Sequence, residues 1–403
     1  MKQANSSRIH LPLGFTFAAG VAGIKPSGRA DLALVQAPPG TTAAAVFTRN
    51  RVVAAPVAVG REFLNQTGGR VRALVVNSGN ANCATGAEGI RACRRVCRQV
   101  ARMLKVRTEE VFPSSTGIIG VPLPVGKLLA KLPGLVSAQA DAKRAAAQFA
   151  EAILTTDTKV KLASQSLRSR RGTVQLLGIA KGSGMIHPQL ATMLVFLFTD
   201  LAAEPGKLKR LLRAAADETF HRISVDGDTS TNDTVLVLAS GRSGVGLDQA
   251  GVERQFTRAL VEVCWSLSEQ IVGDGEGAGH QVRLRIEQAR NREEAMAVAR
   301  AIARSLLVKT AWAGADPNWG RILAAMGTAK PSIDSRQVDI LIGDQRVCHR
   351  GMYHRFDRKR AHAQMAKPSY EIRIQLGRGP AAVVFLTADL SAEYVRLNAE
   401  YST

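Results

Sequence analysis

The chain has 403 residues, more than one ordinary hydrophobic core needs, which predicts one large domain or two intimately packed domains. The longest apolar run near its middle, residues 193–198, is far shorter than the roughly 20 residues that cross a bilayer, so we expect a soluble protein without a membrane partner. The 54 Lys and Arg residues against 33 Asp and Glu residues give a formal net charge of +21, which makes nucleic acid a candidate partner.

The N-terminal stretch LPLGFTFAAGVAGI, residues 11–24, has the apolar character of a signal-peptide core, but three glycines interrupt it and a turn-like polar stretch follows. We therefore expect it to be part of the fold. Five cysteines, odd in number and sparse, favour reduced thiols in a cytosol, so we expect a cytoplasmic protein. Cys93 and Cys97 are spaced to ligate a metal, but no second pair lies nearby, and we interpret them as core-facing helix positions.

Strands and helices alternate along the chain. An apolar strand over residues 70–80 ends in a Ser-Gly-Asn turn and leads into a helix over residues 86–104. Further helices are predicted at about residues 138–154, 206–221, 250–272 and 291–308, and Phe149 and Ile153 should share one face of the first. Other strands are predicted over residues 173–180, 192–198, 233–240, 281–288, 337–343, 370–377 and 381–388. The pattern predicts an α/β (α+β) protein with layered sheets flanked by helices.

The basic residues are scattered over stretches such as RACRRVCRQVARMLKVR and KLKRLLR, several of which have the pattern of the polar face of an amphipathic helix. Aromatic residues make up only 5% of the chain, and no stacking strip or nucleic-acid-binding signature is present. We interpret the charge as a solvated basic surface, with a nucleic-acid-binding protein kept as an alternative.

The stretch KGSGMIHPQLATMLVFLFTD, residues 181–200, runs from a glycine-rich loop directly into an apolar strand, with Thr192 at the boundary. A threonine that begins a buried strand is ordinarily a strand former. The small residues before it allow close approach of a ligand, and its position suits an N-terminal nucleophile, whose α-amine acts as base for its own hydroxyl after the chain is cut. The free amine has an unperturbed pKa of about 7.7–8.0, close to neutral pH.

The chain resembles the ornithine acetyltransferase family of arginine biosynthesis, also called glutamate N-acetyltransferase, whose precursors cleave themselves at an Ala-Thr bond within a KG.GMI.P..ATML motif. That motif is present at residues 181–194. Other segments that resemble the family, in its order, are GVAGIKPSGRADLAL, AAVFTRNRVVAAPV, NSGNAN, SSTGIIG, TTDT, RISVDGDTSTNDT, GDGEGA, ADPNWGRILAAMG and LNAEYST. The resemblance covers the chain from about residue 14 to its last residue.

The resemblance implies self-cleavage between Ala191 and Thr192, which gives an α chain of residues 1–191 and a β chain of residues 192–403; the cut is a processing site and not a domain boundary. Thr192 would then accept the acetyl group of N2-acetyl-L-ornithine and pass it to L-glutamate in a ping-pong reaction. The family suggests an α2β2 heterotetramer and uses no metal or cofactor, although acetyl-CoA could serve as a second donor.

The resemblance also assigns site residues. The oxyanion hole would be formed by Thr116 and Gly117; read without the family, SSTG is equally a polar turn after the short strand EVF. Substrate contacts carry over to Thr155, Lys181, Thr192, Glu276, Asn398 and Thr403. Lys181 suits the substrate α-carboxylate and Glu276 the ornithine δ-ammonium, while Glu276 taken alone is an ordinary loop carboxylate.

Two features qualify this assignment. The stretch VDGDTSTND is rich in carboxylates but lacks the spacing of a calcium loop, and we interpret it as structural hydrogen bonding near the site. After GDGEGA the family usually continues with Thr-Lys, whereas this chain has Gly279 and His280.

A related self-cleaving aminopeptidase remains the alternative among enzymes, because fold alone would not separate an aminopeptidase from an acetyltransferase.

Overall fold

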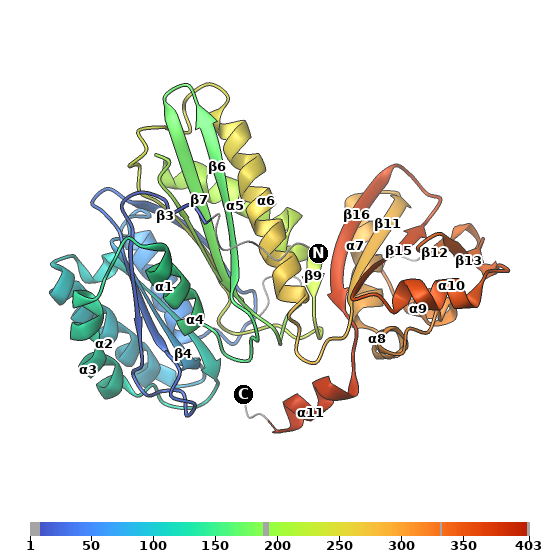
Figure 1. The fold of residues 1–403 in the computed structure, drawn as a ribbon, viewed down its shortest axis with the longest axis horizontal. Coiled ribbons are helices and arrows are strands. Elements are labelled where there is room, and N and C mark those ends of the chain that lie inside the picture. The colour runs from blue at the N-terminus through green and yellow to red at the C-terminus, as the bar shows by residue number, and fades with distance from the viewer. Residues whose placement is uncertain (1–8, 188–192, 331–332, 401–403) are drawn as a thin grey trace.

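The computed structural model describes residues 9–187, 193–330 and 333–400. These residues form three β-sheets with helices on their outer faces (Figure 1). Two sheets lie in the half of the molecule built from the blue to yellow part of the chain. The third lies in the orange and red half. From the third sheet, α11 (Ala392–Glu400) returns toward the first half.

The first sheet has four strands in the order β1-β2-β4-β5. Only β4 and β5 run parallel, so their carboxyl ends lie at the same edge. The strands are β1 (Thr16–Gly20), β2 (Leu32–Gln36), β4 (Ala73–Asn80) and β5 (Val111–Ile118), and the helices on the outer face are α1 (Ala55–Gln66), α2 (Gly86–Leu104) and α3 (Val125–Ser137).

The second sheet has five strands in the order β3-β10-β8-β7-β6, and β8 is its central strand. Residue 194 pairs with residue 181 of the preceding strand. The strands are β3 (Thr42–Phe47), β6 (Lys161–Ser169), β7 (Gly172–Lys181), β8 (Leu194–Thr199) and β10 (Thr234–Ala239); α5 (Pro205–Glu218) and α6 (Val252–Val272) cover the outer face, and α4 (Lys143–Ala152) packs beside β1.

The third sheet has seven strands in the order β14-β13-β12-β15-β11-β16-β9. Its last strand pair joins it to the first half of the chain, because β9 immediately follows α5 and a short turn. The strands are β9 (Ile223–Ser224), β11 (Gln281–Ala289), β12 (Asp339–Ile342), β13 (Gln345–His349), β14 (Met352–Tyr353), β15 (Ser369–Gln375) and β16 (Ala381–Ala388); the helices are α7 (Arg292–Arg304), α8 (Leu306–Ala313), α9 (Trp319–Met326) and α10 (Arg358–Met365). Short 3₁₀ turns span Thr108–Glu110, Phe220–Arg222 and Ser335–Gln337.

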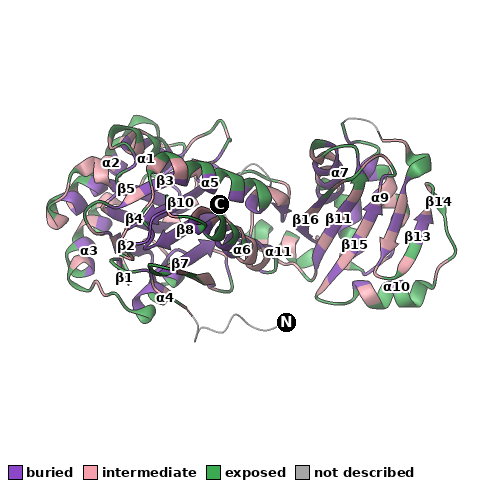
Figure 2. Ribbon diagram, turned by 90° about the horizontal axis from the view of Figure 1, so that it is seen from above, coloured by how far each residue is buried: buried purple, intermediate pink, exposed green. Residues whose placement is uncertain are grey.

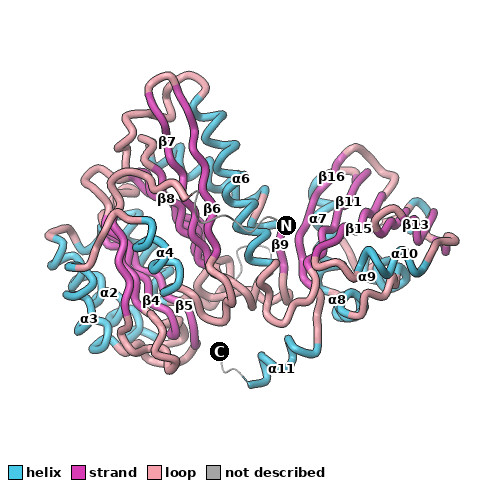
Figure 3. The backbone as a smooth tube through the Cα atoms, viewed as in Figure 1, coloured by secondary structure: helices cyan, strands magenta, loops and turns pink. Residues whose placement is uncertain are grey.

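The first two sheets pack face to face and give four layers: helices, sheet, sheet, helices (Figure 3). Alternate residues of β8 explain this: Phe196 and Phe198 face the first sheet, whereas Val195 and Leu197 face α5 and α6. Every residue of β8 is buried, as the purple strands inside the left half of the molecule in Figure 2 show. The layered fold class predicted from the sequence is confirmed.

Two predicted helices have different bounds in the structure. The helix predicted at 138–154 covers only Lys143–Ala152, because α3 continues to residue 137 and a turn separates the two, but Phe149 and Ile153 are both buried as expected. The helix predicted at 291–308 is two helices. Ser305 has an extended conformation and its hydroxyl accepts a hydrogen bond from the Val308 N–H, so it ends α7 and caps α8.

The N-terminal stretch and the cysteines lie where the sequence predicted them. The stretch at residues 11–24 contributes β1 and the buried rings of Phe15 and Phe17, so it is part of the core. All five cysteines are free and buried, and Cys93 and Cys97 lie on the core face of α2 as predicted. Within the described ranges, none of the helices is both long and apolar enough to cross a membrane.

Candidate active site

One cavity of about 240 Å³ is lined by predicted site residues that come from segments far apart in the sequence. Its lining includes Thr116, Gly117, Thr155, Lys181, Glu276 and Asn398. Ala191, Thr192 and Thr403 lie outside the described residues. The described chain resumes at Met193, and the next residue pairs with Lys181 of β7, so the segment after Thr192 starts beside a residue of the cavity wall.

Thr116 and Gly117 lie within β5, not in a turn after a short strand. The interpretation of SSTG as a turn was therefore wrong. The Ser-Gly-Asn turn predicted at the end of residues 70–80 was also wrong, because β4 continues through Asn80. Polar residues continue both strands because parallel β4 and β5 pair along their whole length. Gly117 has φ +129°, and a Cβ there would lie 2.3 Å from the carbonyl carbon of Gly79, so close approach of the two strands requires glycine.

Lys181 is buried at the end of β7, and hydroxyl groups surround its ammonium group. Its Nζ lies 2.8 Å from Thr155 Oγ1 and 3.5 Å from Thr116 Oγ1. The same Nζ lies 3.6 Å from a carboxylate oxygen of Asp157. Lys181 thus contacts both the segment TTDT and the segment SSTG. Lys181, Thr155 and Thr116 all line the cavity.

Asp157 holds this cation in place. Burial would raise the pKa of Asp157, but the ammonium groups of Lys181 and Lys161, together with the Gly182 N–H at 2.6 Å, hold that pKa well below its usual range. Lys161 donates to Asp157 at 2.8 Å and to Asp274 at 2.5 Å. Two buried cations and two buried carboxylates therefore alternate, so no charge of this group is left unpaired.

The lining of the cavity also contains carboxylates. The carboxylate of Glu276 accepts a hydrogen bond of 3.0 Å from the Asn398 amide, and its backbone N–H donates to the Ser183 carbonyl. A Cβ on Gly184 would lie 2.4 Å from the Glu276 carboxylate, so glycine at this position lets the carboxylate lie against the loop. Asp226 and Asp228 line the same cavity. The cavity therefore combines the cation of Lys181 with three carboxylates.

Asp226 fixes the loop that follows β7. Its carboxylate accepts hydrogen bonds from the backbone N–H groups of Met185 and Ile186, the latter at 2.9 Å. Met185 has φ +55°, a strained conformation for a residue with a side chain. Burial raises the pKa of Asp226 to about 6, although its backbone hydrogen bonds act in the opposite direction.

The segment VDGDTSTND supplies structural hydrogen bonds, as predicted. The Asn232 amide donates to the carbonyls of Ala81 and Ser115, at 2.7 and 2.9 Å, and so joins the edge of the first sheet to the second. Asp233 accepts the Met193 N–H at 3.0 Å. Burial raises the pKa of Asp233 well above its usual value, although the hydrogen bonds from the Met193 N–H and Ser230 act in the opposite direction.

Sequence reasoning missed Asp157, Asp226 and Tyr394. Asp157 lies inside the motif TTDT, so a charged residue within a hydroxyl-rich motif was an available signal. Tyr394 gave no such signal: it lines the cavity only because α11 returns to it. A Cβ on Gly277 would lie 2.3 Å from the Tyr394 backbone nitrogen, so the helix packs directly on the loop of Glu276.

The departure from the family at Gly279 and His280 is accommodated by one carboxylate. The Asp389 carboxylate accepts the Gly279 N–H at 3.0 Å and lies 2.8 Å from His280 Nδ1. Both contacts attach the loop that carries Glu276 to the end of β16. In the described part of the chain, no group of three or more His, Cys, Asp or Glu side chains could hold a metal ion.

His187 is the last residue of the first described range and is buried. Arg304 Nε donates to His187 Nε2 at 2.8 Å, so the ring proton is on Nδ1, which donates to Ser224 Oγ at 3.1 Å. Burial, with the charges of Arg304 and Arg300, lowers the pKa of His187 to about 3. The neutral ring thus links the loop to α7 and β9.

This environment predicts a pH dependence of stability. Between about pH 6.5 and pH 3 the unfolded chain binds a proton on His187 that the folded chain does not, so the free energy of unfolding should fall as the pH is lowered. The slope from this group is at most about 1.4 kcal/mol per pH unit. Urea unfolding of the protein and of His187→Gln at several pH values should show a shallower dependence in the variant; equal slopes would contradict it.

Comparison with known proteins identifies the family of this chain. The ArgJ family matches residues 16–403. The chain is 43% identical over 394 residues to the arginine biosynthesis bifunctional protein ArgJ of Methylococcus capsulatus, covering 97% of this chain and 95% of that protein. It is 41% identical over 396 residues to that of Chlorobaculum tepidum, covering 98% and 97%.

Among solved structures, the arginine biosynthesis bifunctional protein ArgJ of Bacillus halodurans is 37% identical, with a TM-score of 0.49, over 52% of this chain and 98% of that chain. Ornithine acetyltransferase of Mycobacterium tuberculosis, in complex with ornithine, is 38% identical, with a TM-score of 0.40, over 45% and 94%. The family match and the two relatives cover nearly the whole chain at more than 40% identity. This chain therefore belongs to the ArgJ family.

Proposed function

We propose that this protein is an acetyltransferase of arginine biosynthesis that moves the acetyl group of N2-acetyl-L-ornithine to L-glutamate, giving L-ornithine and N-acetyl-L-glutamate. Membership in the ArgJ family supports acyl transfer in that pathway. The observation that carries the proposal is that Lys181, Glu276, and Thr116 and Gly117 of β5 all line one cavity, with the Thr116 hydroxyl 3.5 Å from Lys181 Nζ.

The nucleophile in this proposal is Thr192, released by self-cleavage. Its hydroxyl attacks the Ala191 carbonyl, the peptide nitrogen leaves as the new α-amine, and water hydrolyses the resulting ester. The α chain, residues 1–191, and the β chain, residues 192–403, would stay together. β8 and β10 of the β chain lie between β3 and β7 of the α chain in one continuous sheet.

The acetyl transfer would then follow two matched steps. The Thr192 hydroxyl attacks the acetyl carbonyl, its proton passes by way of the α-amine to the leaving amine of ornithine, and an acetyl ester forms. The amine of glutamate attacks that ester, loses a proton and restores the hydroxyl. Each step passes through an oxyanion, for which the Thr116 hydroxyl and the Gly117 N–H are the proposed donors.

The charged side chains that line the cavity are complementary to the charges of ornithine. The α-carboxylate would lie against Lys181, and the δ-ammonium against Glu276, Asp226 and Asp228. Glutamate presents a carboxylate where ornithine presents an ammonium. The Tyr394 hydroxyl lines the same cavity and can donate a hydrogen bond to that carboxylate.

Replacing Lys181 by methionine should raise the KM of both substrates, by about tenfold to a hundredfold, because each loses a charge-assisted contact to its α-carboxylate. Asp157 would keep Lys161 and the Gly182 N–H as partners, so the fold should persist. Steady-state kinetics with each substrate varied in turn measure the effect, and Lys159→Met, an exposed residue nearby, is the control. A change confined to one substrate would contradict a shared carboxylate site.

Replacing Glu276 by glutamine should separate the two substrates. The KM for acetylornithine should rise about tenfold or more through loss of a charge-assisted contact, while that for glutamate stays the same or falls. The amide keeps the size of the side chain and can still accept a hydrogen bond from Asn398. Equal increases for both substrates would show that Glu276 does not contact the δ-ammonium.

The activity itself is tested by supplying glutamate with acetylornithine or with acetyl-CoA as the donor. Product with acetylornithine supports the proposal, and product with acetyl-CoA as well would make the protein bifunctional. Release of free acetate without acetylglutamate would instead identify the hydrolase alternative. Size-exclusion chromatography with light scattering tests the proposed α2β2 assembly.

A further inference from the structure

A second cavity, of about 710 Å³, lies apart from the active site. It opens between α1 and α5, and β3 forms its floor. None of its lining residues lines the active-site cavity. The floor is made of small and apolar residues of β3, from Ala43 to Phe47, which leaves the character of the cavity to the side chains along its rim.

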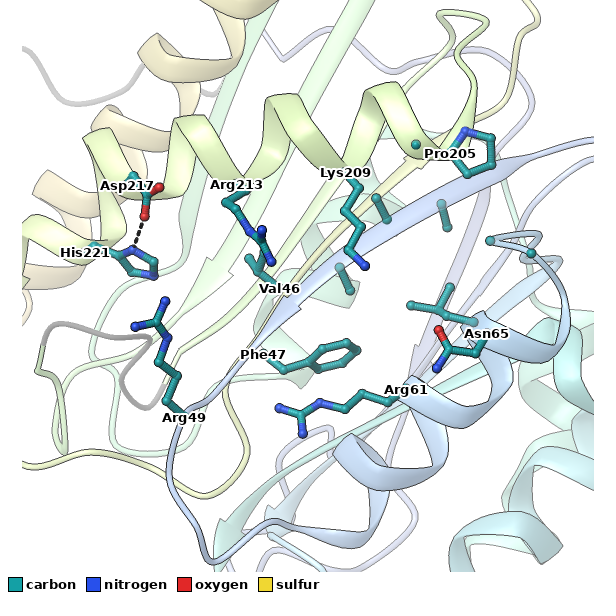
Figure 4. A pocket seen from close by; sticks show the side chains of 17 residues that line it. Val46, Phe47, Arg49, Arg61, Asn65, Pro205, Lys209, Arg213, Asp217 and His221 are labelled. Atoms are coloured by element: carbon teal, nitrogen blue, oxygen red, sulfur yellow. Dashed lines mark hydrogen bonds and ion pairs between the residues drawn. The ribbon is translucent and has the colours of Figure 1, made fainter.

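The rim is strongly cationic. Arg49 follows β3, Arg61 lies on α1, and Lys209 and Arg213 lie on α5. Figure 4 shows the side chains of α5 and those of Arg49 and Arg61 reaching toward the same space from opposite sides. Asp217 is the one carboxylate in the lining, so cations outnumber carboxylates by four to one.

That carboxylate already has a partner. Asp217 accepts a hydrogen bond of 2.7 Å from His221 Nδ1 at one end of the cavity. Burial lowers the pKa of His221, and the positive charges of Arg49 and Arg300 lower it further, in opposition to Asp217. Asp217 therefore keeps its negative charge and offsets one of the four positive charges, which leaves the rim an excess of about three.

The cations of the rim differ from those around them. In the described part of the chain, Arg49, Lys209 and Arg213 form no ion pair. Arg210, also on α5, lies outside the lining and pairs with Glu253 at 3.0 Å. Four cations held around one cavity without carboxylate partners repel one another, a cost that a bound anion would remove.

Arg61 is held in position before any ligand arrives. It donates to the Thr48 carbonyl at 2.9 Å, and its guanidinium lies over the Phe47 ring, 5.1 Å from the centroid. Phe47 in turn stacks on Phe112 of β5. A planar guanidinium that is fixed in this way loses little freedom when it binds an oxyanion, and its remaining N–H groups match the geometry of a phosphate.

We propose that this cavity binds an anion that carries two or more phosphate groups. One phosphate monoester carries a charge of about −1.5 to −2, so two phosphates match an excess of about three positive charges, whereas a single carboxylate does not. Inorganic pyrophosphate and free nucleotides offer this chemistry, and so do the phosphate groups of a coenzyme A thioester. The proposal does not depend on which acyl donor the active site uses.

The test is isothermal titration calorimetry of the full-length protein at low ionic strength with pyrophosphate, ADP and coenzyme A. We expect pyrophosphate to bind, and added KCl to weaken it. Arg213→Ala and Lys209→Ala should each raise its Kd about tenfold or more, whereas Arg210→Ala should leave it unchanged. All three positions are exposed, and Arg213→Ala should retain acetyl transfer from acetylornithine, which shows that it folds.

The arms of the experiment separate the sources. Coenzyme A binding more tightly than pyrophosphate and ADP, with the same loss in Arg213→Ala, assigns the cavity to a thioester donor; equal or tighter binding of pyrophosphate assigns it to free phosphate compounds. Absence of pyrophosphate binding, an unchanged Kd in Arg213→Ala, or an equal loss in Arg210→Ala overturns the proposal. If Arg213→Ala fails to fold, Arg49→Gln replaces it with the same expectation.

Discussion

Replacing Thr116 by alanine should slow acetyl transfer by about 10²- to 10³-fold, the usual cost of removing one oxyanion donor. The fold should persist, because Thr116 is a β5 residue whose backbone pairing with β4 does not depend on its hydroxyl. Its Oγ1 lies 3.5 Å from Lys181 Nζ, so the hydroxyl already faces the cation that we assign to the substrate carboxylate. The measurement is the single-turnover rate of acetyl-enzyme formation.

Two controls make this result specific to the hydroxyl. Thr116→Ser should recover most of the rate, because it restores the donor. The KM for acetylornithine should change much less than kcat in Thr116→Ala, since the oxyanion exists only in the transition state. A rate within a few fold of the unaltered protein, or a loss that falls on KM alone, would remove Thr116 from the oxyanion hole.

Replacing Thr192 by alanine should abolish both maturation and transfer. Alanine has no hydroxyl to attack the preceding carbonyl, so the protein should remain one chain and should show no acetyl-enzyme by mass spectrometry. The core should be unaffected, because β8 begins at Leu194 and Asp233 still holds the Met193 N–H. Turnover is measured with acetylornithine and glutamate together.

Thr192→Ser is the matched variant. It keeps a hydroxyl and lacks the methyl group, so it should still cleave and turn over, more slowly in both steps because the oxygen is held less firmly. Transfer by an uncleaved Thr192→Ala chain would show that the acetyl group is carried elsewhere or passed directly between substrates.

The fold could be predicted largely from long apolar runs. The second sheet is the best example: β8 and β10 are buried on both faces, so their sequences are continuously apolar and their bounds were predicted to within two residues. The break at Ser305 was not apparent, because the helical pattern continues across it and only the side-chain cap on Val308 shows that a second helix begins. The exposed Leu306 and Leu307 are part of the same misleading pattern.

The site was predictable where a motif carries its own chemistry, and not where contacts arise from tertiary structure. Lys181 and Glu276 belong to glycine-rich motifs that brought them to notice. The place of Asp226 in the site depends on hydrogen bonds from the backbone N–H groups of Met185 and Ile186, which no local sequence pattern shows. Likewise SSTG has the composition of a turn, but pairing with β4 keeps it in a strand.

The claim that Thr192 is a self-liberated nucleophile is tested most directly by the intact mass and N-terminal sequences of the purified protein. Division of 43.0 kDa in proportion to 191 and 212 residues predicts two fragments of about 20.4 and 22.6 kDa. Edman sequencing should give a second N-terminus that reads Thr-Met-Leu-Val. A single chain of 43.0 kDa with full transferase activity would contradict the account.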